Sequence, residues 1–409
     1  MTPNIPKGII ELDTTHIRCI IFSIKDDNSY EILSTAVVDT EGVHNGAITN
    51  LAKATKVIRS CISIAEKKAS VLLKKINVII EQPEFLCTKF SKNKKINGSK
   101  IHKDDIEFLL KEAKKQVILN DKKHSIIHIF NHNYLVDGKT FIEEPIDVYA
   151  DYLSHEMTFI TMPKNNIKNI NQAFIDCDIE IERFISGTFA LGVKLLNNNE
   201  LQIGSSLVNI GFEKTSLGLF KNLALVHSIT FPVGTNHVTK DISKVCSLSL
   251  EESENIRNQI DFSFNNLNNL FDENGILKKL YFKTSSYRKI SKALLLNIVK
   301  TRLDEILELI KKQITLSGLN GVFGINLFIE GDGSNLLNLD KYFSSFFKLD
   351  VKKLIANNQG ERESDNNLVF CLGALKIIKD GWETEAIPEP VNKYGEKTGF
   401  FAKFFTKRL

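Results

Sequence analysis

Three histidines at intervals of four residues, His124, His128 and His132, have the spacing of a helical metal site. The residues between them include three isoleucines and a phenylalanine, which favours a strand instead. At about 3.3 Å per residue, strand positions four apart lie roughly 13 Å from one another, too far to share one ion. We therefore expect a strand in this stretch and no metal site.

Two hairpin candidates place polar turns between apolar strands. The first runs from Gly8 to Phe22 and turns at Asp13-Thr14-Thr15-His16; the second runs from Ser206 to Phe220 and turns at Asn209-Ile210-Gly211-Phe212-Glu213-Lys214. In actin-like ATPases, two such turns hold the phosphates from opposite lobes through backbone N–H groups, while Asp side chains hold Mg²⁺ and water. A third turn, Gly331-Asp332-Gly333-Ser334, is the candidate for adenine and ribose, although an ordinary turn would explain this pattern equally well.

The elements around these turns alternate between strand and helix in both halves of the chain. Apolar spacing predicts helices at Asn50–Ser70, Leu250–Ile260 and Lys289–Ser317, and strands at Ile76–Glu81 and Leu327–Glu330. Two similar halves predict an α/β protein of two lobes with an internal duplication. We place the first lobe at 1–84 and the second at 163–379.

The segment between the lobes, 85–162, has a different pattern. It contains a predicted helix at Lys103–Val117 and predicted strands at Ser125–Phe130 and Met157–Met162, which indicates an inserted α+β subdomain. Lysines outnumber acidic residues 11 to 5 from Thr88 to His124. One interpretation is a solvated surface around a loop at Ser91–Lys100. The other is an electrostatic face toward an acidic partner or anionic lipid, with nucleic acid disfavoured because few aromatic residues interleave.

Length and composition exclude several classes of protein. The 409 residues are 43% hydrophobic and 25% charged, which excludes general disorder and suggests two domains. With 53 Lys and Arg against 49 Asp and Glu, the chain is too balanced to be devoted to nucleic acid. We expect no spanning helix, because no apolar run approaches about 18 residues, and no secretory leader, because a carboxylate and His16 fall within the first sixteen residues. Six scattered cysteines without a CxxC pattern predict reduced thiols in the cytoplasm.

The end of the chain is a candidate membrane anchor. Residues 380–395 are acidic at first, contain proline and lack a period, which predicts an extended linker. A helix over 396–409 would gather four phenylalanines on one side, a pattern that suits a membrane surface. Docking in a partner's groove and folding back onto the core are the alternatives. The membrane residues of this prediction are Phe400, Phe401, Lys403, Phe404, Phe405, Lys407 and Arg408.

Taken in order, further motifs resemble the FtsA family of bacterial actin-like cell-division proteins, and the resemblance runs from about Lys7 to the last residue. Glu254 and Arg257 match the family's Glu-x-x-Lys pair, which lies by the ribose. The insertion resembles the subdomain that distinguishes the family from actin and the Hsp70 chaperones. Two longer motifs are similar to the G-x-N-x-(I/V)-T-x-D-I signature and the closing A-x-G-L element: Gly234-Thr235-Asn236-His237-Val238-Thr239-Lys240-Asp241-Ile242 and Cys371-Leu372-Gly373-Ala374-Leu375.

Both phosphate turns depart from the family pattern. The family's D-I-G-T-(S/A)-K reads Glu11-Leu12-Asp13-Thr14-Thr15-His16 here, which puts Asp13 at a glycine position. In the second turn Asn209 replaces an aspartate, and Phe212-Glu213 replaces two glycines. Two like charges about 4 Å apart repel by about 4 kcal/mol at an effective dielectric near 20. We therefore expect ATP binding to be weak or lost, with Mg²⁺ uncertain, unless Lys214 and His16 rebuild a phosphate site.

The resemblance implies a two-lobed actin-like fold, a duplicated ribonuclease H-like core, and a scaffold instead of an enzyme. A protein of this kind tethers FtsZ filaments to the cytoplasmic face of the inner membrane at the septum, self-associates into protofilaments and recruits later division proteins. A sugar or acyl-phosphate kinase of the same superfamily is one alternative, and a pilus-assembly adaptor of the same fold is another. The altered phosphate turns argue against the kinase, and the terminal helix argues against both.

Overall fold

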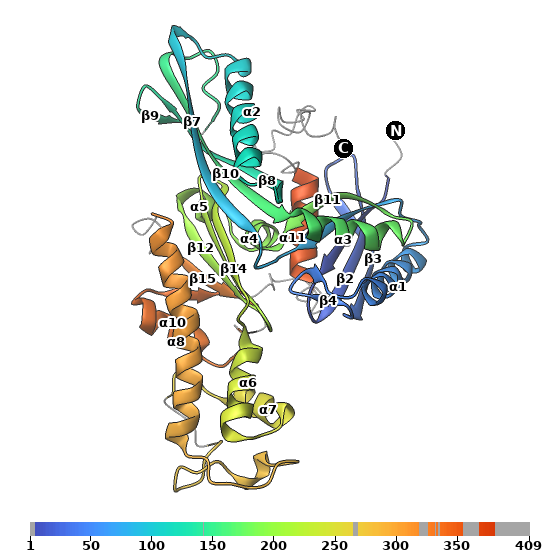
Figure 1. Cartoon of the computed structure of the whole chain (residues 1–409), viewed down its shortest axis with the longest axis vertical. Coiled ribbons are helices and arrows are strands. Elements are labelled where there is room, and N and C mark those ends of the chain that lie inside the picture. Colours follow the sequence, from blue (N-terminus) through green and yellow to red (C-terminus); the bar gives the residue numbers. More distant parts are fainter. Residues whose placement is uncertain are drawn as a thin grey trace. The chain divides into compact units, whose positions relative to one another are not determined.

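The computed structural model describes residues 5–141, 143–264, 269–318, 326–331, 333, 336–354 and 368–380 (Figure 1). The chain divides into two compact units. The first comprises Met1–Gly204, Gly218–Ile229 and Ala356–Leu409, and the second Ser205–Leu217 and Thr230–Ile355. Ser334 and all residues after Asp380 lie outside the described residues, so the linker and terminal helix stay predictions.

The first unit is built on a five-stranded sheet of order β11-β6-β1-β2-β3. β1, β2 and β3 are antiparallel neighbours, as the predicted hairpin requires, whereas β6 and β11 run parallel to β1. Parallel pairing of β11 with β6 assigns residues 163–204 to the first unit, although the sequence placed them in the second lobe. The strands are β1 (Lys7–Leu12), β2 (His16–Ile24), β3 (Tyr30–Asp39), β6 (Lys75–Ile80) and β11 (Glu180–Ser186).

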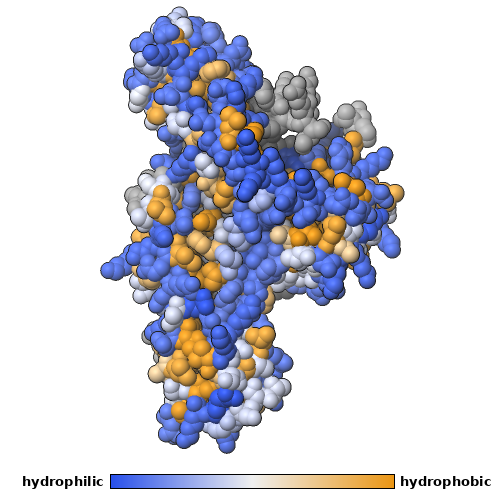
Figure 2. Space-filling view, in the orientation of Figure 1, coloured by the Kyte–Doolittle hydropathy of each residue, from blue (hydrophilic) through white to orange (hydrophobic). Residues whose placement is uncertain are grey.

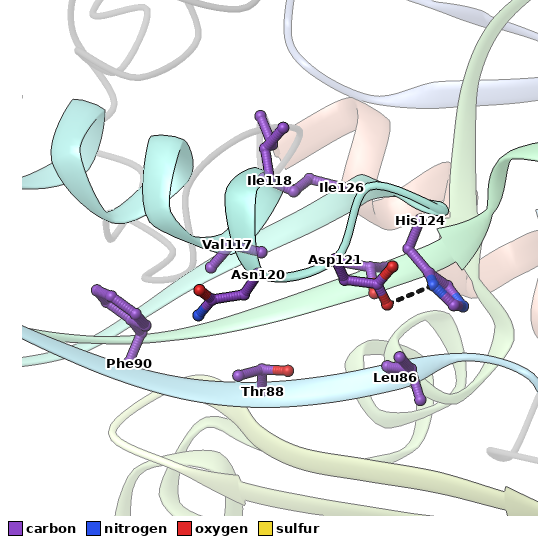
Figure 3. A pocket seen from close by; sticks show the side chains of 10 residues that line it. Leu86, Thr88, Phe90, Val117, Ile118, Asn120, Asp121, His124 and Ile126 are labelled. Atoms are coloured by element: carbon purple, nitrogen blue, oxygen red, sulfur yellow. Dashed lines mark ion pairs between the residues drawn. The ribbon is translucent and has the colours of Figure 1, made fainter.

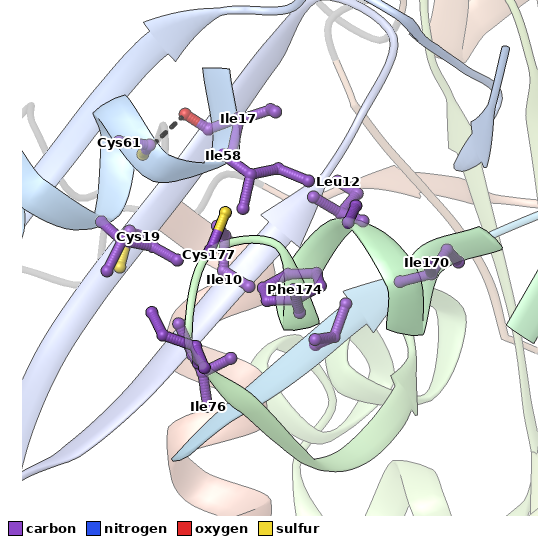
Figure 4. Packing of buried hydrophobic residues seen from close by; sticks show 14 of the residues in the cluster. Ile10, Leu12, Ile17, Cys19, Ile58, Cys61, Ile76, Ile170, Phe174 and Cys177 are labelled. Atoms are coloured by element: carbon purple, nitrogen blue, oxygen red, sulfur yellow. Dashed lines mark hydrogen bonds between the residues drawn. The ribbon is translucent and has the colours of Figure 1, made fainter. Parts of the chain in front are cut away.

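Helices α1 (Leu51–Ala69) and α3 (Lys164–Ile175) cover one face of this sheet (Figure 4). α1 begins where Asn50 accepts a hydrogen bond from the Lys53 N–H, and it ends at Ser70 in a left-handed conformation. This confirms the helix predicted there. Ile10, Ile58 and Phe174 are fully buried between the helices and the sheet, and such burial stabilises a fold by roughly 1.5–3 kcal/mol for each large side chain.

A second group of helices belongs to the same unit: α4 (Gly187–Leu195), α5 (Asn198–Ile203) and α11 (Val369–Asp380). α11 carries the closing motif of the sequence analysis, and Gly373 lies against α4. A Cβ atom at Gly373 would be only 2.0 Å from the carbonyl oxygen of Ala190. The glycine of this motif therefore permits two helices to pack closely.

The inserted segment forms a four-stranded antiparallel sheet of order β7-β10-β8-β9, with α2 (Lys103–Asn120) on one face. The strands are β7 (Leu86–Lys100), β8 (His124–Val136), β9 (Lys139–Phe141) and β10 (Tyr149–Pro163). The strand expected through His124 and His128 is confirmed. The loop expected at Ser91–Lys100 is wrong, because these residues form the last two thirds of β7. Lysines are common on edge strands, where they oppose aggregation. In the sequence, the same lysines look like those of a solvated loop, so the strand was not predicted.

His128 joins the inserted sheet to the first one. Its Nε2 accepts a hydrogen bond from the Ser186 N–H at 2.9 Å, at the start of α4, and its ring lies against Phe130 and Phe189. Burial, with a smaller contribution from Arg183, lowers the pKa of His128 to about 3. The imidazole is therefore neutral at physiological pH and serves as an acceptor.

We predict that the first unit becomes less stable as the pH is lowered, because His128 is protonated more readily in the unfolded chain than in the folded one. Its folded pKa lies below the ordinary 6.5, so the unfolded chain binds the proton first as pH falls, and stability is lost from pH 6.5 toward pH 3. Between pH 7.5 and 5, the free energy of unfolding of the first unit should fall by about 2 kcal/mol from this group alone.

Urea unfolding of the wild type, His128→Gln and the exposed-site control His44→Gln, each at several pH values, measures this effect. Only His128→Gln should flatten the pH dependence, because glutamine keeps an acceptor without titrating. Equal pH dependence in all three proteins would contradict the prediction.

The second sheet has the order β14-β13-β12-β15-β16, and the division between the units passes through β13 and β14. In the first sheet, β2 and β3 lie on one side of the central strand β1, and the parallel strands β6 and β11 lie on its other side. In the second sheet, β13 and β14 lie on one side of the central strand β12, and the parallel strands β15 and β16 lie on its other side. This shared order confirms the duplicated α/β fold. The strands are β12 (Ser205–Ile210), β13 (Thr215–Lys221), β14 (Ala224–Phe231), β15 (Leu327–Glu330) and β16 (Val351–Lys353).

The helices of the second unit are α6 (Thr235–Cys246), α7 (Leu250–Gln259), α8 (Lys292–Leu316) and α10 (Leu339–Phe347). α7 and α8 confirm the helices predicted at Leu250–Ile260 and Lys289–Ser317. In α7, Glu252 accepts hydrogen bonds from the N–H groups of Lys283, Thr284 and Ser285. This buried carboxylate ties the segment before α8 to α7.

Candidate functional site

The first predicted phosphate turn, Asp13 to His16, joins β1 to β2. Asp13 Oδ2 accepts hydrogen bonds from the Thr15 hydroxyl at 3.1 Å and, more weakly, from the Thr15 N–H at 3.4 Å. The Thr15 hydroxyl also contacts His16 Nδ1 at 3.1 Å. The carboxylate at the glycine position thus bonds the donors of its own turn, and a phosphate would have to compete with it.

The same turn is held by its neighbours. Thr14 Oγ1 accepts a hydrogen bond from the Asn45 N–H at 2.9 Å, and the Thr40 hydroxyl donates to the Asp13 carbonyl at 2.9 Å. His16 lies 3.5 Å from the exposed carboxylate of Asp39. The hydroxyl groups of this turn are engaged in fixing its shape.

Sequence reasoning missed the pair of Glu11 and Arg18. In the resemblance, Glu11 stands where the family's first turn has an aspartate. Its carboxylate lies 3.4 Å from the Arg18 guanidinium, and both side chains are mostly buried. The hairpin register pairs these residues directly across β1 and β2, and this register could have revealed them. The charge that would face a metal ion is already balanced by arginine.

The second predicted turn, 209–214, is closed by a hydrogen bond from the Gly211 N–H to the Lys214 carbonyl at 2.9 Å. The first turn of α6 docks on it. The N–H groups of Thr235 and Asn236 donate to the carbonyls of Gly211 and Phe212 at 3.0 and 2.8 Å. Helix N-termini are common phosphate sites because their N–H groups are open, whereas two of these N–H groups bond the turn.

Glu213 is anchored to the same helix. Its carboxylate accepts hydrogen bonds from Asn236 Nδ2 at 2.7 Å and Lys240 Nζ at 3.0 Å, and His237 Nδ1 lies 3.8 Å away. Burial alone would raise the pKa of Glu213, but the hydrogen bonds from Asn236 and Lys240 outweigh it and lower that pKa. Glu213 is therefore an ionised part of a local network, and its repulsion of phosphate is reduced by that network.

The glycine-rich turn packs on the second phosphate turn. Gly331 has a φ of +95°, and a Cβ atom there would lie 2.2 Å from Asn209 Oδ1. A Cβ atom at Gly333 would lie 2.5 Å from Ile210 Cγ2 and 2.6 Å from Thr235 Cγ2. Both glycines are thus required by the close approach of two turns and, for Gly331, by backbone conformation.

The predicted ribose pair, Glu254 and Arg257, makes hydrogen bonds within the second unit. Arg257 is buried and donates to the Thr235 carbonyl at 3.2 Å and to the Thr239 hydroxyl at 2.8 Å, while Glu254 accepts from it at 3.1 Å. Burial lowers the pKa of Arg257 without neutralising it. One cluster in the second unit therefore brings together Asn209, Gly211, Lys214, Gly234, Glu254, Arg257, Gly331 and Gly333.

The two sheets share one strand order, each has a polar turn after its central strand, and the first unit carries the insertion between β6 and β11; these features define an actin-like fold. Among solved structures, the PilM-PilN type IV pilus biogenesis complex is similar with a TM-score of 0.62 and 10% identity, covering 92% of this chain and 99% of that one. At this identity the likeness shows the fold alone.

Two family models match the chain: cell division protein FtsA over residues 206–370, and the SHS2 domain inserted in FtsA over residues 85–161. The cell division protein FtsA of Agrobacterium fabrum is 24% identical over 342 residues, covering 81% of this chain and 77% of that protein. The FtsA of Bacillus subtilis is 25% identical over 325 residues, covering 77% and 71%. The two models together match more than half of the chain, which belongs to the FtsA family of cell division proteins.

We predict that restoring the family residues strengthens nucleotide binding. Asp13→Gly releases the donors of Thr15 and removes a charge, and Asn209→Asp returns a metal-side carboxylate. The double variant should bind Mg-ATP at least tenfold more tightly than the wild type, which corresponds to about 1.4 kcal/mol. Isothermal titration calorimetry measures the affinity, and a phosphate-release assay measures turnover.

A matched control makes the same two chemical changes elsewhere. Asp178→Gly suits a left-handed backbone with a φ of 58°, and Asn197→Asp keeps a helix cap, so this pair should leave both units folded. It should not change ATP affinity. Micromolar binding by the wild type, with faster hydrolysis than in the restored variant, would refute the interpretation of a degenerate site.

Proposed function

We propose that this protein is a scaffold that tethers FtsZ filaments to the cytoplasmic face of the inner membrane at the division septum. In this proposal it self-associates, recruits later division proteins and has feeble or no ATPase activity. The observation that carries the proposal is the match of both FtsA models to the chain. The two phosphate turns support the scaffold role, because their polar groups are engaged within each unit.

The site geometry favours a scaffold over a sugar or acyl-phosphate kinase. Phosphoryl transfer depends on positioned phosphates and on a metal ion held by carboxylates. At the two positions where the family's turns have an aspartate, Glu11 is paired with Arg18, and Asn209 is an uncharged amide. A kinase would need a carboxylate that is available to the metal at one of them.

The second alternative, an adaptor of pilus assembly, rests on the likeness to the PilM-PilN complex. That likeness has 10% identity, whereas the FtsA relatives are 24–25% identical over most of the chain. The sequence relationship therefore favours cell division. Deletion of the gene in its own organism tests this directly, because loss of a division scaffold should produce filamentous cells that keep their pili.

Membrane attachment is assigned to the predicted helix at 396–409. No helix in the described part of the chain has the length and apolar character needed to cross a bilayer. The proposed anchor lies outside the described residues and rests on the sequence pattern of four phenylalanines beside cations.

We predict that truncation after Lys393 releases the protein from vesicles that contain anionic lipid. Each buried phenylalanine contributes on the order of 1.5–3 kcal/mol, and each cation about 1 kcal/mol. Changing all four phenylalanines to alanine should have the same effect as truncation in a vesicle sedimentation assay. Changing Lys403 and Lys407 to alanine should weaken binding less. Truncated protein that sediments as well as the full chain would exclude this anchor.

We also predict that the full chain brings FtsZ polymers to such vesicles. Fluorescent FtsZ with GTP should collect on the vesicle surface when the full chain is present. It should stay in solution when the truncated chain is used. If the full chain binds vesicles but FtsZ polymers remain in solution, the anchor is correct and the tethering role is wrong.

A further inference from the structure

We propose that the outer edge of β7, in the inserted subdomain, docks an extended acidic segment of a partner protein. The segment would add a strand to the sheet through backbone hydrogen bonds, with carboxylates beside the lysines of β7. This inference goes beyond the proposed function and does not depend on membrane or FtsZ binding. It rests on three observations: an open sheet edge, its charge, and a pocket beside it.

The first observation is the position of β7 in the sheet. It is the terminal strand of the order β7-β10-β8-β9, and it pairs with β10 from Leu86 to Lys95 and again at Ser99 and Lys100, with a bulge between these stretches. No described strand pairs with its other side. Alternate residues of an edge strand direct both their N–H and C=O groups away from the neighbouring strand. The stretch from Leu86 to Lys95 is a regular, long edge, and such edges accept an added peptide strand.

The second observation is charge. β7 carries five lysines and no acidic residue. Lys94 is paired with Asp105 at 2.6 Å and Lys100 with Asp147 at 3.7 Å. Lys92 and Lys95 have no carboxylate partner among the described residues. Their Nζ atoms instead lie 5.9 and 6.0 Å from the ring centres of Phe90 and Tyr152.

The arrangement of the lysines favours an acidic peptide over a membrane surface or a second copy of this chain. Successive side chains of a strand point to opposite faces, so Lys92 and Lys94 lie on one face of the sheet and Lys89 and Lys95 on the other. A flat membrane surface would meet only one of these faces, whereas a peptide strand along the edge lies beside both. A second copy of β7 would place lysine rows next to each other, and like charges across a strand pair are destabilising. An acidic strand along the edge lies beside the lysines of both faces, and its charge is opposite to theirs.

The third observation is a cavity of about 70 Å³ beside the first half of β7 (Figure 3). Leu86, Thr88 and Phe90 of β7 line one side, and Ile118 at the end of α2 lines another. An added strand would direct alternate side chains toward this face, where one small aliphatic side chain could enter the cavity.

The polar end of the cavity and the surrounding surface define the ligand further. His124 Nδ1 lies 2.6 Å from Asp121 Oδ2 at the end of α2, so the carboxylate already has a partner. The surface in Figure 2 is mostly hydrophilic with scattered apolar patches, and the exposed apolar side chains of the subdomain include Leu86 and Ile118 beside the cavity. A partner segment that alternates acidic and aliphatic residues therefore fits the edge.

The test uses the full chain and a fluorescein-labelled heptapeptide of alternating glutamate and valine, with a lysine–valine peptide for comparison. Fluorescence anisotropy should show binding of the acidic peptide only. Lys92→Glu with Lys95→Glu should weaken binding at least tenfold. The control pair Lys115→Glu with Lys139→Glu makes the same charge change on α2 and on the opposite sheet edge, and should alter the affinity less than twofold.

Amide hydrogen exchange locates the contact and separates strand addition from nonspecific attraction. The acidic peptide should slow exchange within 86–100 and leave 139–141 unchanged. Thermal unfolding of each double variant should match the wild type, which confirms that the sheet is intact.

Several outcomes would overturn the proposal. Equal losses in both double variants, or no protection of 86–100, would show that the edge does not dock the peptide. Binding of anionic phosphatidylglycerol vesicles or of oligothymidine through Lys92 and Lys95, without binding of the acidic peptide, would assign the edge to another partner. Dissociation of a wild-type dimer by Lys92→Glu with Lys95→Glu would assign it to a second copy of this chain.

Discussion

The first turn of α6 docks on the turn 209–214, and most of the second unit depends on this contact. It requires a residue without a side chain at position 234, because a Cβ atom there would lie 2.5 Å from the Gly211 carbonyl oxygen. Two backbone hydrogen bonds then join the helix to the turn. The glycine-rich turn after β15 rests on the same place, with Gly333 against Thr235. A bulkier residue at 234 would separate all three segments.

The rest of α6 extends this junction to the neighbouring helices. Arg257 of α7 donates to Thr239, and Arg302 of α8 holds Asp241 through two contacts of 2.7 and 3.1 Å. Bidentate pairs of arginine and carboxylate are among the stronger polar contacts in proteins. In this chain, Thr239 and Asp241 of the family signature therefore join α6 to α7 and α8, and these contacts need no bound nucleotide.

Charge is balanced locally in both phosphate turns. Glu11 faces Arg18, Asp13 bonds Thr15, and Glu213 bonds Asn236 and Lys240. A carboxylate satisfied by neighbours of its own unit requires neither a metal ion nor a phosphate counter-charge. This arrangement explains how the fold tolerates acidic residues where the family has glycine.

The inserted subdomain is fixed at one end and open at the other. His128 accepts from the N–H of Ser186, and Glu81 accepts from the Ser186 hydroxyl and from the Thr188 N–H, all at the start of α4. Thr158 of β10 donates to the Val226 carbonyl at 3.2 Å. β7 starts at this base, where the Ser228 N–H donates to Cys87 Sγ, and no described strand pairs with its outer edge. Attachment through these hydrogen bonds together with an open edge suits a module that presents a binding surface.

The sequence by itself determined the elements and their duplication, because apolar periodicity and polar turns are local signals. The hairpin at Gly8–Phe22 and the helices α1, α7 and α8 follow from such signals, and the motif order indicated the family. The membership of 163–204 in the first unit did not follow, since parallel pairing of β6 and β11 joins segments about a hundred residues apart. β7 was missed because its lysines give an edge strand the composition of a loop. The partners of Glu11 and Glu213 were decided only by the tertiary structure. The sequence shows that each residue is acidic, but strand register places Arg18 beside Glu11, and the docking of α6 places Asn236 beside Glu213.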